Sequence, residues 1–575
     1  MSPSGTQVAT SKIRKKIYFA LFASLLIVTA IVTIVAAVIS RNKSTNNIDY
    51  KIAAHPVVRS SCSLTFYPQL CFSALSKVPD AASKITSPKD VIAMSLNVTI
   101  TAVQKNYFSI KKLTSARSGG RTKRDKAALH DCLEMVDETL DELHKIKQEL
   151  QEYPAVNKSI SQQADELKIL LSASMTNQET CLDGFSHDKA DKKVRKTLIK
   201  GQIYVFKMCS NALAMIKNLT DTDMANEVQT SRRHLGELEN EKGWPEWLSA
   251  GDRRLLQSTT VTPDVTVAAD GTGNYLTVSE AVAAAPASSS TRYIIKIKEG
   301  VYREVVDVPK SKTNLMFVGD GRANTIITAS NNVVDGRTTF NSATVAVVGT
   351  GFLARDITIQ NAAGPSKHQA VALRVGADFS AFYRCGFIAY QDTLYVHSLR
   401  QFFVNCYIAG SVDFIFGNSA VVIQNTDIHA RRPGDKQKNM VTAQGRDDPN
   451  QNTGIVIQKC RIGATSDLLP VIDEFPTYLG RPWKQYSRTV VMQTEISDVI
   501  NPAGWFEWDG DFALDTLFYA EYANTGPGAD TSNRVTWKGY RVITDASEVE
   551  MFTAENFISG GSWLSSTGFP YTLGL

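Results

Sequence analysis

The feature that most constrains the fold is a loose repeat of about 20 residues in the second half of the 575-residue chain. It appears as RCGF at Arg384–Phe387, NCYI at Asn405–Ile408 and NTDI at Asn425–Ile428, with KCRI at Lys459–Ile462 a longer step later. A repeat of this length with several short strands per unit is typical of a parallel β-helix, in which each coil stacks on the previous one. We therefore expect an all-β parallel β-helix.

Short β-branched runs separated by Gly, Asn and Asp accompany the repeat and predict strands. The runs are Tyr293–Lys298, Leu315–Val318, Thr344–Val348, Asp356–Gln360, Ala370–Val375, Ala420–Gln424 and Gly454–Gln458. A β-sandwich is the competing architecture. It would need hairpins, and few two-residue turn signals separate these runs.

A coil of about 21 residues predicts which side chains become neighbours. Equivalent positions in adjacent coils lie ~4.8 Å apart, the spacing of neighbouring strands. Cys385 and Cys406 are 21 residues apart and are predicted to form a disulfide. The same register brings Asp392 close to Asp413, also 21 residues apart.

Two carboxyl groups at this spacing suggest chemistry. They cannot easily both be charged, so the pair is expected to divide into a proton donor and an anion. Gln369 and Gln391, separated by 22 residues, would lie beside them. A calcium site and a purely structural polar ladder are the alternatives.

Aromatic residues crowd the same stretch of sequence. They are Phe379, Phe382, Tyr383, Phe387, Tyr390, Tyr395, Phe402, Phe403, Tyr407, Phe414 and Phe416. A groove that stacks sugar rings and an aromatic core would both produce this pattern, and composition alone does not separate them. His397 lies nearby in sequence, although a lone His is more often structural.

The first half of the chain has a different periodicity. Between Cys62 and about Ile216, apolar residues recur every three or four positions, as in Leu129–Leu150, Val91–Leu113, Ala164–Met175 and Ile203–Ile216. This spacing predicts amphipathic helices and an all-α four-helix bundle. A coiled-coil stalk is the alternative, but the intervening glycines and prolines favour several shorter helices.

An uncharged run of 23 residues, Ile17–Ile39, precedes the helical half. At ~1.5 Å per residue it could cross a ~30 Å hydrocarbon layer. Four basic residues before it favour a cytoplasmic N-terminus and a luminal remainder. We expect a signal anchor that could later be removed, with a buried soluble helix as the alternative.

The eight cysteines include no C-x-x-C pair, which argues against a zinc site. Entry into an oxidising compartment makes disulfides the better interpretation, and we expect Cys62, Cys71, Cys132 and Cys181 to be bonded. Asn97, Asn157 and Asn218 open N-x-S/T sequons and are candidate glycosylation sites, as is Asn42. We expect neither a metal nor a cofactor.

A polar segment, 221–257, is predicted to be a linker between the two halves. It carries two dibasic sites, Arg232-Arg233 and Arg253-Arg254, where a processing protease could cut. The predicted organisation is an N-terminal tail and anchor at 1–50, a helical domain at 55–220, this linker, and a β-helix domain at 258–575.

The two halves differ in charge. From Gln257 onward there are 26 Lys and Arg against 31 Asp and Glu, leaving 36 against 26 for the first 256 residues. The β-half thus carries −5 and the first half +10, so nucleic acid is an unexpected partner for the β-half. The chain has no G-x-S-x-G elbow and no H-E-x-x-H motif, which argues against a serine esterase or a zinc hydrolase.

Five segments of the β-half resemble, in order, the motifs of plant pectin methylesterases. They are GVYRE at Gly300–Glu304, QAVAL at Gln369–Leu373, QDTL at Gln391–Leu394, DFIFG at Asp413–Gly417 and LGRPW at Leu479–Trp483. The likeness extends from about Val265 to the C-terminus and includes NPAGW at Asn501–Trp505.

The helical half resembles the pectin methylesterase inhibitor domain. Cys62–Cys71 and Thr176–Phe185 match its motifs well, whereas Asp131–Val136 lacks the usual Tyr. The resemblance implies an intramolecular partner for the catalytic domain, which would block the cleft or assist folding until the linker is cut. Separate inhibitor proteins are further expected partners.

The resemblance implies a right-handed parallel β-helix and hydrolysis of the methyl esters of galacturonate units in pectin, at the cell wall. It assigns Asp413 as nucleophile, Asp392 as proton donor and then base, and Gln369 and Gln391 as donors to the oxyanion. Arg481 would hold Asp413 ionised.

Trp483 would stack on a sugar, and Tyr390 and Phe414 are further candidate substrate contacts, with Gln369 and Arg481. A glycosidase or lyase on the same fold is the alternative enzyme, since two carboxylates ~5 Å apart suit a retaining glycosidase. An inert wall-binding scaffold carrying an inhibitor domain is the third hypothesis.

Overall fold

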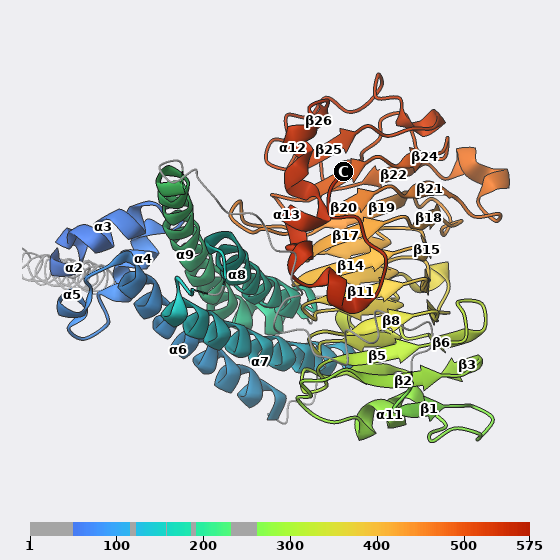
Figure 1. Ribbon diagram of the computed structural model, residues 1–575, viewed down its shortest axis with the longest axis horizontal. Helices are drawn as coiled ribbons and strands as arrows, with labels where there is room; N and C mark the ends of the chain where they lie inside the picture. The colour runs from blue at the N-terminus through green and yellow to red at the C-terminus, as the bar shows by residue number, and fades with distance from the viewer. Residues whose placement is uncertain (1–49, 116–121, 157, 186–190, 232–261) are drawn as a thin grey trace, which may run out of the picture.

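The computed structural model describes residues 50–115, 122–156, 158–185, 191–231 and 262–575. It contains a helical part and a larger β-part that lie against each other (Figure 1). The predicted anchor at 17–39, the sequons at Asn42 and Asn157, and both dibasic sites lie outside the described residues. In the part of the chain that is described, no helix combines the length and the apolar character needed to cross a bilayer.

Four long helices, α6 to α9, form the bundle, and each packs against two of the others. The helices of this part are α2 (Tyr50–Ala54), α3 (Pro56–Ser63), α4 (Pro68–Leu75), α5 (Ala81–Lys84), α6 (Pro88–Ser115), α7 (Lys123–Glu152), α8 (Ile160–Asp183) and α9 (Asp191–Ser231). The predicted bundle is therefore present. The linker was predicted to begin at 221, but α9 continues to Ser231.

Local sequence signals account for the helix ends and for the covalent ties between helices. Capping boxes start α7 at Thr122 and α8 at Ser159. Disulfides join Cys62 to Cys71, between α3 and α4, and Cys132 to Cys181, between α7 and α8. These four cysteines are the ones expected to be bonded in this half.

The β-part consists of three parallel sheets, the arrangement of a parallel β-helix. The 11-stranded sheet contains β1 (Val265–Val267), β2 (Tyr293–Ile297), β5 (Leu315–Val318), β8 (Leu353–Arg355), β11 (Ser380–Tyr383), β14 (Arg400–Val404), β17 (Ala420–Gln424), β20 (Gly454–Gln458), β23 (Arg488–Met492), β25 (Phe518–Tyr522) and β26 (Tyr540–Ile543). The 8-stranded sheet contains β3 (Gly300–Arg303), β6 (Thr325–Ala329), β9 (Thr358–Asn361), β12 (Gly386–Ile388), β15 (Tyr407–Gly410), β18 (Asp427–Ala430), β21 (Arg461–Ala464) and β24 (Glu495–Ile496).

The 7-stranded sheet contains β4 (Val306–Val308), β7 (Val345–Val347), β10 (Leu373–Val375), β13 (Leu394–Val396), β16 (Ile415–Gly417), β19 (Asn439–Gln444) and β22 (Thr477–Gly480). Short helices lie at the two ends of the chain in this part: α11 (Val278–Ala284), α12 (Ala546–Val549) and α13 (Ala554–Ile558). Aliphatic and aromatic side chains from all three sheets fill the interior of the coil.

The sequence repeat marks the turn from the 11-stranded into the 8-stranded sheet. Each turn has two residues, and the first has a left-handed backbone, with φ of 53° at Arg384, 53° at Asn405 and 54° at Lys459. The second residue is buried, as at Ile357, Cys385, Cys406, Thr426, Cys460 and Thr494. A small inward side chain at this position is therefore what the RCGF and NCYI segments share.

The predicted Cys385–Cys406 disulfide was wrong. Both are free, buried cysteines, and each thiol lies within hydrogen-bonding distance of backbone carbonyls, for example Cys406 Sγ with Val404 O at 3.4 Å. Residues stacked in register lie ~4.8 Å apart with parallel side chains, whereas a disulfide needs Cβ atoms ~3.5–4.5 Å apart. The 21-residue spacing predicted the stacking correctly but not the bond.

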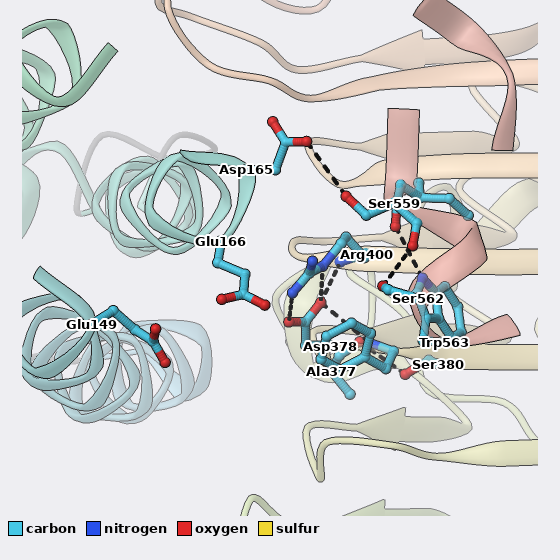
Figure 2. Close-up of polar contacts among 12 residues, drawn as sticks. Glu149, Asp165, Glu166, Ala377, Asp378, Ser380, Arg400, Ser559, Ser562 and Trp563 are labelled. Atoms are coloured by element: carbon cyan, nitrogen blue, oxygen red, sulfur yellow. Dashed lines mark hydrogen bonds and ion pairs between the residues drawn. The ribbon is translucent and has the colours of Figure 1, made fainter. Parts of the chain in front are cut away.

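The helical part covers the outer face of the 7-stranded sheet. Phe340, Tyr395, Phe416 and Trp483 belong to the same apolar cluster as the interior of the bundle. A second contact lies at the C-terminal segment, where Ser559 Oγ donates to Asp165 of α8 at 3.4 Å. Figure 2 shows this contact beside the buried ion pair of Arg400 and Asp378.

Two candidate glycosylation sites fall within the described helices. Asn97 lies in α6 and Asn218 in α9, and both side chains are exposed. Exposure is what an attached glycan requires, so both stay predictions that the fold permits.

Candidate functional site

Asp392 and Asp413 lie just before neighbouring strands of the 7-stranded sheet, β13 and β16. Leu394 pairs with Ile415 in the parallel ladder of β13 and β16, so the two aspartates, each two residues earlier, occupy equivalent positions one coil apart. Both have left-handed backbones, with φ of 63° and 51°. Asp tolerates this conformation better than most residues, and such strain is common at functional sites.

Arg481 holds Asp413 with both arms of its guanidinium group. Nε donates to Asp413 Oδ1 at 2.8 Å and Nη2 donates to Oδ2 at 2.7 Å. The sequence predicted these two residues as partners, and the structure brings them together across 68 positions. A bidentate contact fixes both the charge and the orientation of the carboxylate.

Among the described residues, no basic side chain holds Asp392 as Arg481 holds Asp413. The two aspartates are almost equally buried, with Asp392 7% exposed and Asp413 6% exposed. Burial and the neighbouring Asp413 carboxylate raise the pKa of Asp392 well above its usual value, and Arg481 only partly offsets this. Burial also raises the pKa of Asp413, but the hydrogen bonds and charge of Arg481 act in the opposite direction. Asp392 is therefore the member of the pair that keeps a proton.

Gln369 and Gln391 line the same cavity as the two aspartates. The backbone N–H of Ala370 donates to the carbonyl of Gln391 at 3.2 Å, which places the two glutamines on adjacent coils. The side-chain oxygen of Gln391 is buried and has no hydrogen-bond partner. Both amide groups are positioned to meet a ligand at the pair of aspartates.

The cavity has a volume of about 300 Å³ and is polar at its floor and aromatic at its walls. The rings of Tyr395 and Phe416 stack 4.2 Å apart, one coil from each other, and Trp483 lies 6.0 Å from Phe416. Gly445 permits this placement of Trp483, because a Cβ there would lie 2.9 Å from the indole ring. An aromatic wall beside a carboxyl pair suits a sugar ring that carries an ester.

Two predicted substrate contacts do not belong to the cavity. Phe414 is 0% exposed and packs in the hydrophobic interior of the coil, so its side chain cannot reach a substrate. The ring of Tyr390 lies 3.9 Å from the guanidinium of Arg431, which also donates to the Tyr390 hydroxyl, and neither residue lines the cavity. The clustering of aromatic residues in the sequence did not show which rings point into the coil and which point out of it.

Two aromatic cavity residues escaped the sequence analysis. Phe340 comes from a single 3₁₀ turn, Phe340–Ser342, and Trp508 comes from a loop, with Arg481 lying 4.4 Å from its ring. Neither lies in the repeat. The likeness in sequence includes NPAGW at Asn501–Trp505, just before Trp508, but does not single out Trp508.

His397 is buried and is not a proton donor at ordinary pH. Its ring nitrogens lie 2.9 Å from Thr180 Oγ1 and 3.0 Å from Ser398 Oγ. Burial lowers the pKa of His397 to about 3. The structural interpretation of this residue therefore holds.

The C-terminal end of α8 closes the cavity from the helical side. Thr180, Asp183 and Gly184 line it opposite the aspartates. Nearby, Asn418 donates to Thr176 at 2.9 Å and Lys484 pairs with Glu179 at 2.7 Å. The Thr176–Phe185 segment that resembles the inhibitor motif is thus the segment that covers the site.

No cluster of metal-binding side chains is found among the described residues: none of the His, Cys, Asp and Glu there gather in threes around a point that could hold an ion. The β-part contributes two carboxyl groups, two amides and one guanidinium to this cavity. That set suits acyl transfer by a carboxylate nucleophile with a neighbouring acid.

Comparison with known proteins gives two family matches. Residues 264–561 match the pectinesterase family and residues 56–215 match the plant invertase/pectin methylesterase inhibitor family. A Solanum lycopersicum protein named pectinesterase/pectinesterase inhibitor U1 is 65% identical over 577 residues, covering 99% of this chain and 98% of the relative.

Other relatives consist of the β-part alone. A Daucus carota pectinesterase is 75% identical over 319 residues, which cover 56% of this chain and 100% of the relative. The solved structure of pectin methylesterase from carrot superposes with a TM-score of 0.55 at 74% identity, covering 55% of this chain and 100% of that one. The chain belongs to the pectinesterase family of carboxylic ester hydrolases and carries an inhibitor-type helical domain ahead of the catalytic one.

Proposed function

We propose that this chain hydrolyses methyl esters of galacturonate units in pectin by covalent catalysis, with Asp413 as the nucleophile. The observation that carries the mechanism is the unequal pair of aspartates. Asp413 is fixed by two hydrogen bonds from Arg481, while the pKa of Asp392 is raised well above its usual value by burial and by Asp413. One anion and one acid at a single cavity floor are what ester cleavage by this route requires.

In the first half-reaction a carboxylate oxygen of Asp413 attacks the carbonyl carbon of the ester. The carbonyl electrons move onto oxygen and return as the bond to the methoxy group breaks. Asp392 gives its proton to the departing oxygen, so methanol leaves as a neutral molecule. An acyl-enzyme anhydride on Asp413 remains.

Gln391 and Gln369 stabilise the negative charge on the carbonyl oxygen in the tetrahedral intermediate. Both residues line the cavity that the aspartates share. Donors aimed at an oxyanion in a site with little water contribute ~10²- to 10³-fold in rate.

In the second half-reaction Asp392, now ionised, takes a proton from water. The resulting hydroxide attacks the acyl carbon, and Asp413 leaves as a carboxylate. The enzyme returns to its starting protonation state, and the product is a galacturonic acid unit that releases one proton to the solvent and becomes a free carboxylate. Trp483, Tyr395 and Phe416 supply the wall against which the sugar ring lies.

A glycosidase or lyase on this fold is the competing reaction, because two close carboxylates also suit glycosidic cleavage. The bidentate Arg481 contact and the two glutamines favour acyl transfer instead. The test is to incubate the β-part with methylesterified pectin and to measure methanol and new reducing ends in parallel. We expect methanol without new reducing ends; new chain ends without methanol would reject the proposal.

The helical domain is proposed to block the cleft intramolecularly until the linker is cut. Thr180, Asp183 and Gly184 line the cavity, so the helical domain occupies space that a polymer would need in order to reach the aspartates. Cutting at Arg232-Arg233 or Arg253-Arg254 would let the domain dissociate. The same contacts would allow separate inhibitor proteins to bind once the domain has left.

The cell wall is the proposed destination. Disulfides such as Cys132–Cys181 persist in the oxidising secretory pathway, where exposed Asn97 and Asn218 could be glycosylated. The hydrophobic run at 17–39 would direct the chain into that pathway, with its N-terminus in the cytoplasm, and would tether it until processing.

A further inference from the structure

The ion pairs that connect the two parts all have the same polarity. In every such pair among the described residues the helical part supplies the carboxylate and the β-helix supplies the base. The pairs are Lys310 with Asp137 and Asp141, Arg374 with Glu134, and Lys484 with Glu179 and Asp183. This polarity opposes the net charges, since the first 256 residues carry +10 and the rest −5.

The three bases lie along the sheet that carries the aspartates, on both sides of them. Arg374 lies on β10 and pairs in register with Tyr395 on β13, the strand that Asp392 precedes. Lys484 follows β22 on the other side, next to Trp483, and Lys310 lies just beyond β4 at the far end. A polymer that passes over the aspartates would meet these bases in turn.

Arg374 is held as a carboxylate receptor would be, yet its bond to the helical part is poor. It is 4% exposed, and its guanidinium carbon lies 3.4 Å from the ring centre of Phe340. Its Nη2 reaches Glu134 at only 3.4 Å, and its Nε has no hydrogen-bond partner. A guanidinium fork fixed on an aromatic face suits a carboxylate that can accept from both arms, which Glu134 does not do.

Arg374 lies in a cavity that borders the catalytic one at Phe340. Phe340 lines both the cavity at the aspartates and a second one of about 550 Å³ that contains Arg374, Lys310 and Glu134. On the other side, Lys484 has Trp483 beside it and is enclosed by Glu179 and Asp183. Glu134, Glu179 and Asp183 of the helical part thus line the catalytic cavity or a cavity that borders it.

We infer that Arg374 and Lys484 bind the free carboxylates of already de-esterified galacturonate units on either side of the reacting ester, and that Glu134, Glu179 and Asp183 of the helical part mimic those carboxylates. The inference rests on the proposed function, because it takes the polymer in the cleft to be pectin. It makes the enzyme's own product a competitor of the helical part. Lys310 is more exposed and should contribute less, as exposed ion pairs do.

The test uses the β-part, residues 262–575, because the carrot relative consists of this part alone and has a solved structure. Methanol release from fully methylesterified pectin is measured with increasing polygalacturonate that carries no methyl esters. We expect Arg374→Gln and Lys484→Gln each to raise the inhibition constant of polygalacturonate about tenfold, the usual loss for one charge-assisted contact. Arg374→Lys, which keeps the charge and loses the fork, should fall between.

The matched control is Arg461→Gln, which removes a base from the 8-stranded sheet, where it pairs with Asp427. It should change the inhibition constant less than about twofold, the size of an exposed ion pair. If Arg374→Gln and Lys484→Gln behave like this control, the inference is wrong. The same assay measures methanol release. An unchanged inhibition constant with continued methanol release would therefore reject the inference without rejecting the proposed function.

A second measurement does not depend on folding of the variants or on activity. Full-length chain is cut in the linker without separating the parts, and release of the helical part is followed by size-exclusion chromatography. Polygalacturonate should release it at concentrations where fully methylesterified pectin of the same length does not. Equal release by both polymers would overturn the inference.

Discussion

The helical part and the β-helix hold their buried carboxyl groups by different means. In the helical part the carboxyl of Glu142 is held by neutral partners, Ser174 at 2.9 Å and Asn177 at 3.1 Å. In the β-helix the carboxylate of Asp413 is held by both arms of Arg481. Burial raises the pKa of Glu142 to about 8, whereas Arg481 opposes the effect of burial on the pKa of Asp413.

The same comparison applies to the covalent ties. The helical part has two disulfides, while Cys385, Cys406 and Cys460 of the β-helix are free. A solenoid gains its stability from stacked coils, each contacting its neighbours, and does not need the bonds that a small bundle uses. The difference teaches that the β-helix fixes a charged carboxylate with a base and relies on stacking, while the bundle holds a buried carboxyl group with neutral partners and relies on covalent ties.

The largest expected effect comes from removing the fixed charge. Asp413→Asn keeps the size of the side chain and removes the nucleophile, so methanol release should fall by about 10⁴-fold or more, as for other nucleophile replacements. Binding of pectin should persist, because the cavity walls are unchanged. The rate of methanol release and pectin affinity are measured on the same preparation.

The control is Asp427→Asn, an aspartate of the same part that pairs with Arg461 outside the cavity. Its rate should match the parent. Near-normal turnover by the Asp413 variant would remove that residue from the mechanism.

The next effect concerns the amide donors. Gln391→Ala should lower kcat by ~10²- to 10³-fold with a smaller change in KM, because the contact forms chiefly in the transition state. Gln360→Ala, on β9 of the 8-stranded sheet, should leave both constants unchanged. A Gln391 variant that changed KM alone would show a substrate contact rather than an oxyanion donor.

Replacing bonded cysteines of the helical part should cost more stability than replacing a free cysteine of the β-helix. Replacing Cys132 and Cys181 by Ala opens a loop of 49 residues and should lower the free energy of unfolding of the helical part by about 4 kcal/mol. Cys406→Ala removes one buried sulfur and should cost the β-helix only about 1 kcal/mol. Denaturant unfolding of each part measures both; equal losses would imply a bond at Cys406.

The smallest effect is the pH dependence of the bundle. Because the pKa of Glu142 is about 8 in the folded chain and lower when unfolded, its contribution to stability is complete below the unfolded pKa and is lost as pH rises toward 8. The Tm of the helical part should therefore fall between pH 5 and pH 8. Glu142→Gln should flatten this fall by a few degrees, and exposed Glu152→Gln should not.

Much of this arrangement could be predicted from the sequence. The 21-residue spacing placed Asp392 beside Asp413, and the helical periodicity located α6 to α9. The predictions that failed relied on local sequence patterns, whereas the direction of a side chain depends on the surrounding fold. Phe414 and Phe416 look alike in a crowd of aromatic residues. Phe414, however, lies just before β16 and packs into the interior of the coil, whereas Phe416 lies on β16, alternates with the inward Ile415 and lines the cavity.

Residues that reach the site from outside the repeat could not be predicted from periodicity. Phe340 and Trp508 come from a short turn and a loop, where no periodicity gives their direction. The polar residues from Asp221 to Ser231 were assigned to a linker, but Asp221 pairs with Lys217 one turn earlier and continues α9. The cover formed by Thr180 and Asp183 depends on packing between two parts that are far apart in the chain.

The measurement that tests the account most directly is methanol release by one preparation of full-length chain before and after the linker is cut. A tethered domain acts at an effective concentration of order millimolar, so a contact of micromolar affinity would leave about one chain in 10³ open. After complete cutting and dilution to nanomolar concentration, the rate should rise by about that factor. An unchanged rate after verified cutting would contradict the claim that the helical part covers a working site.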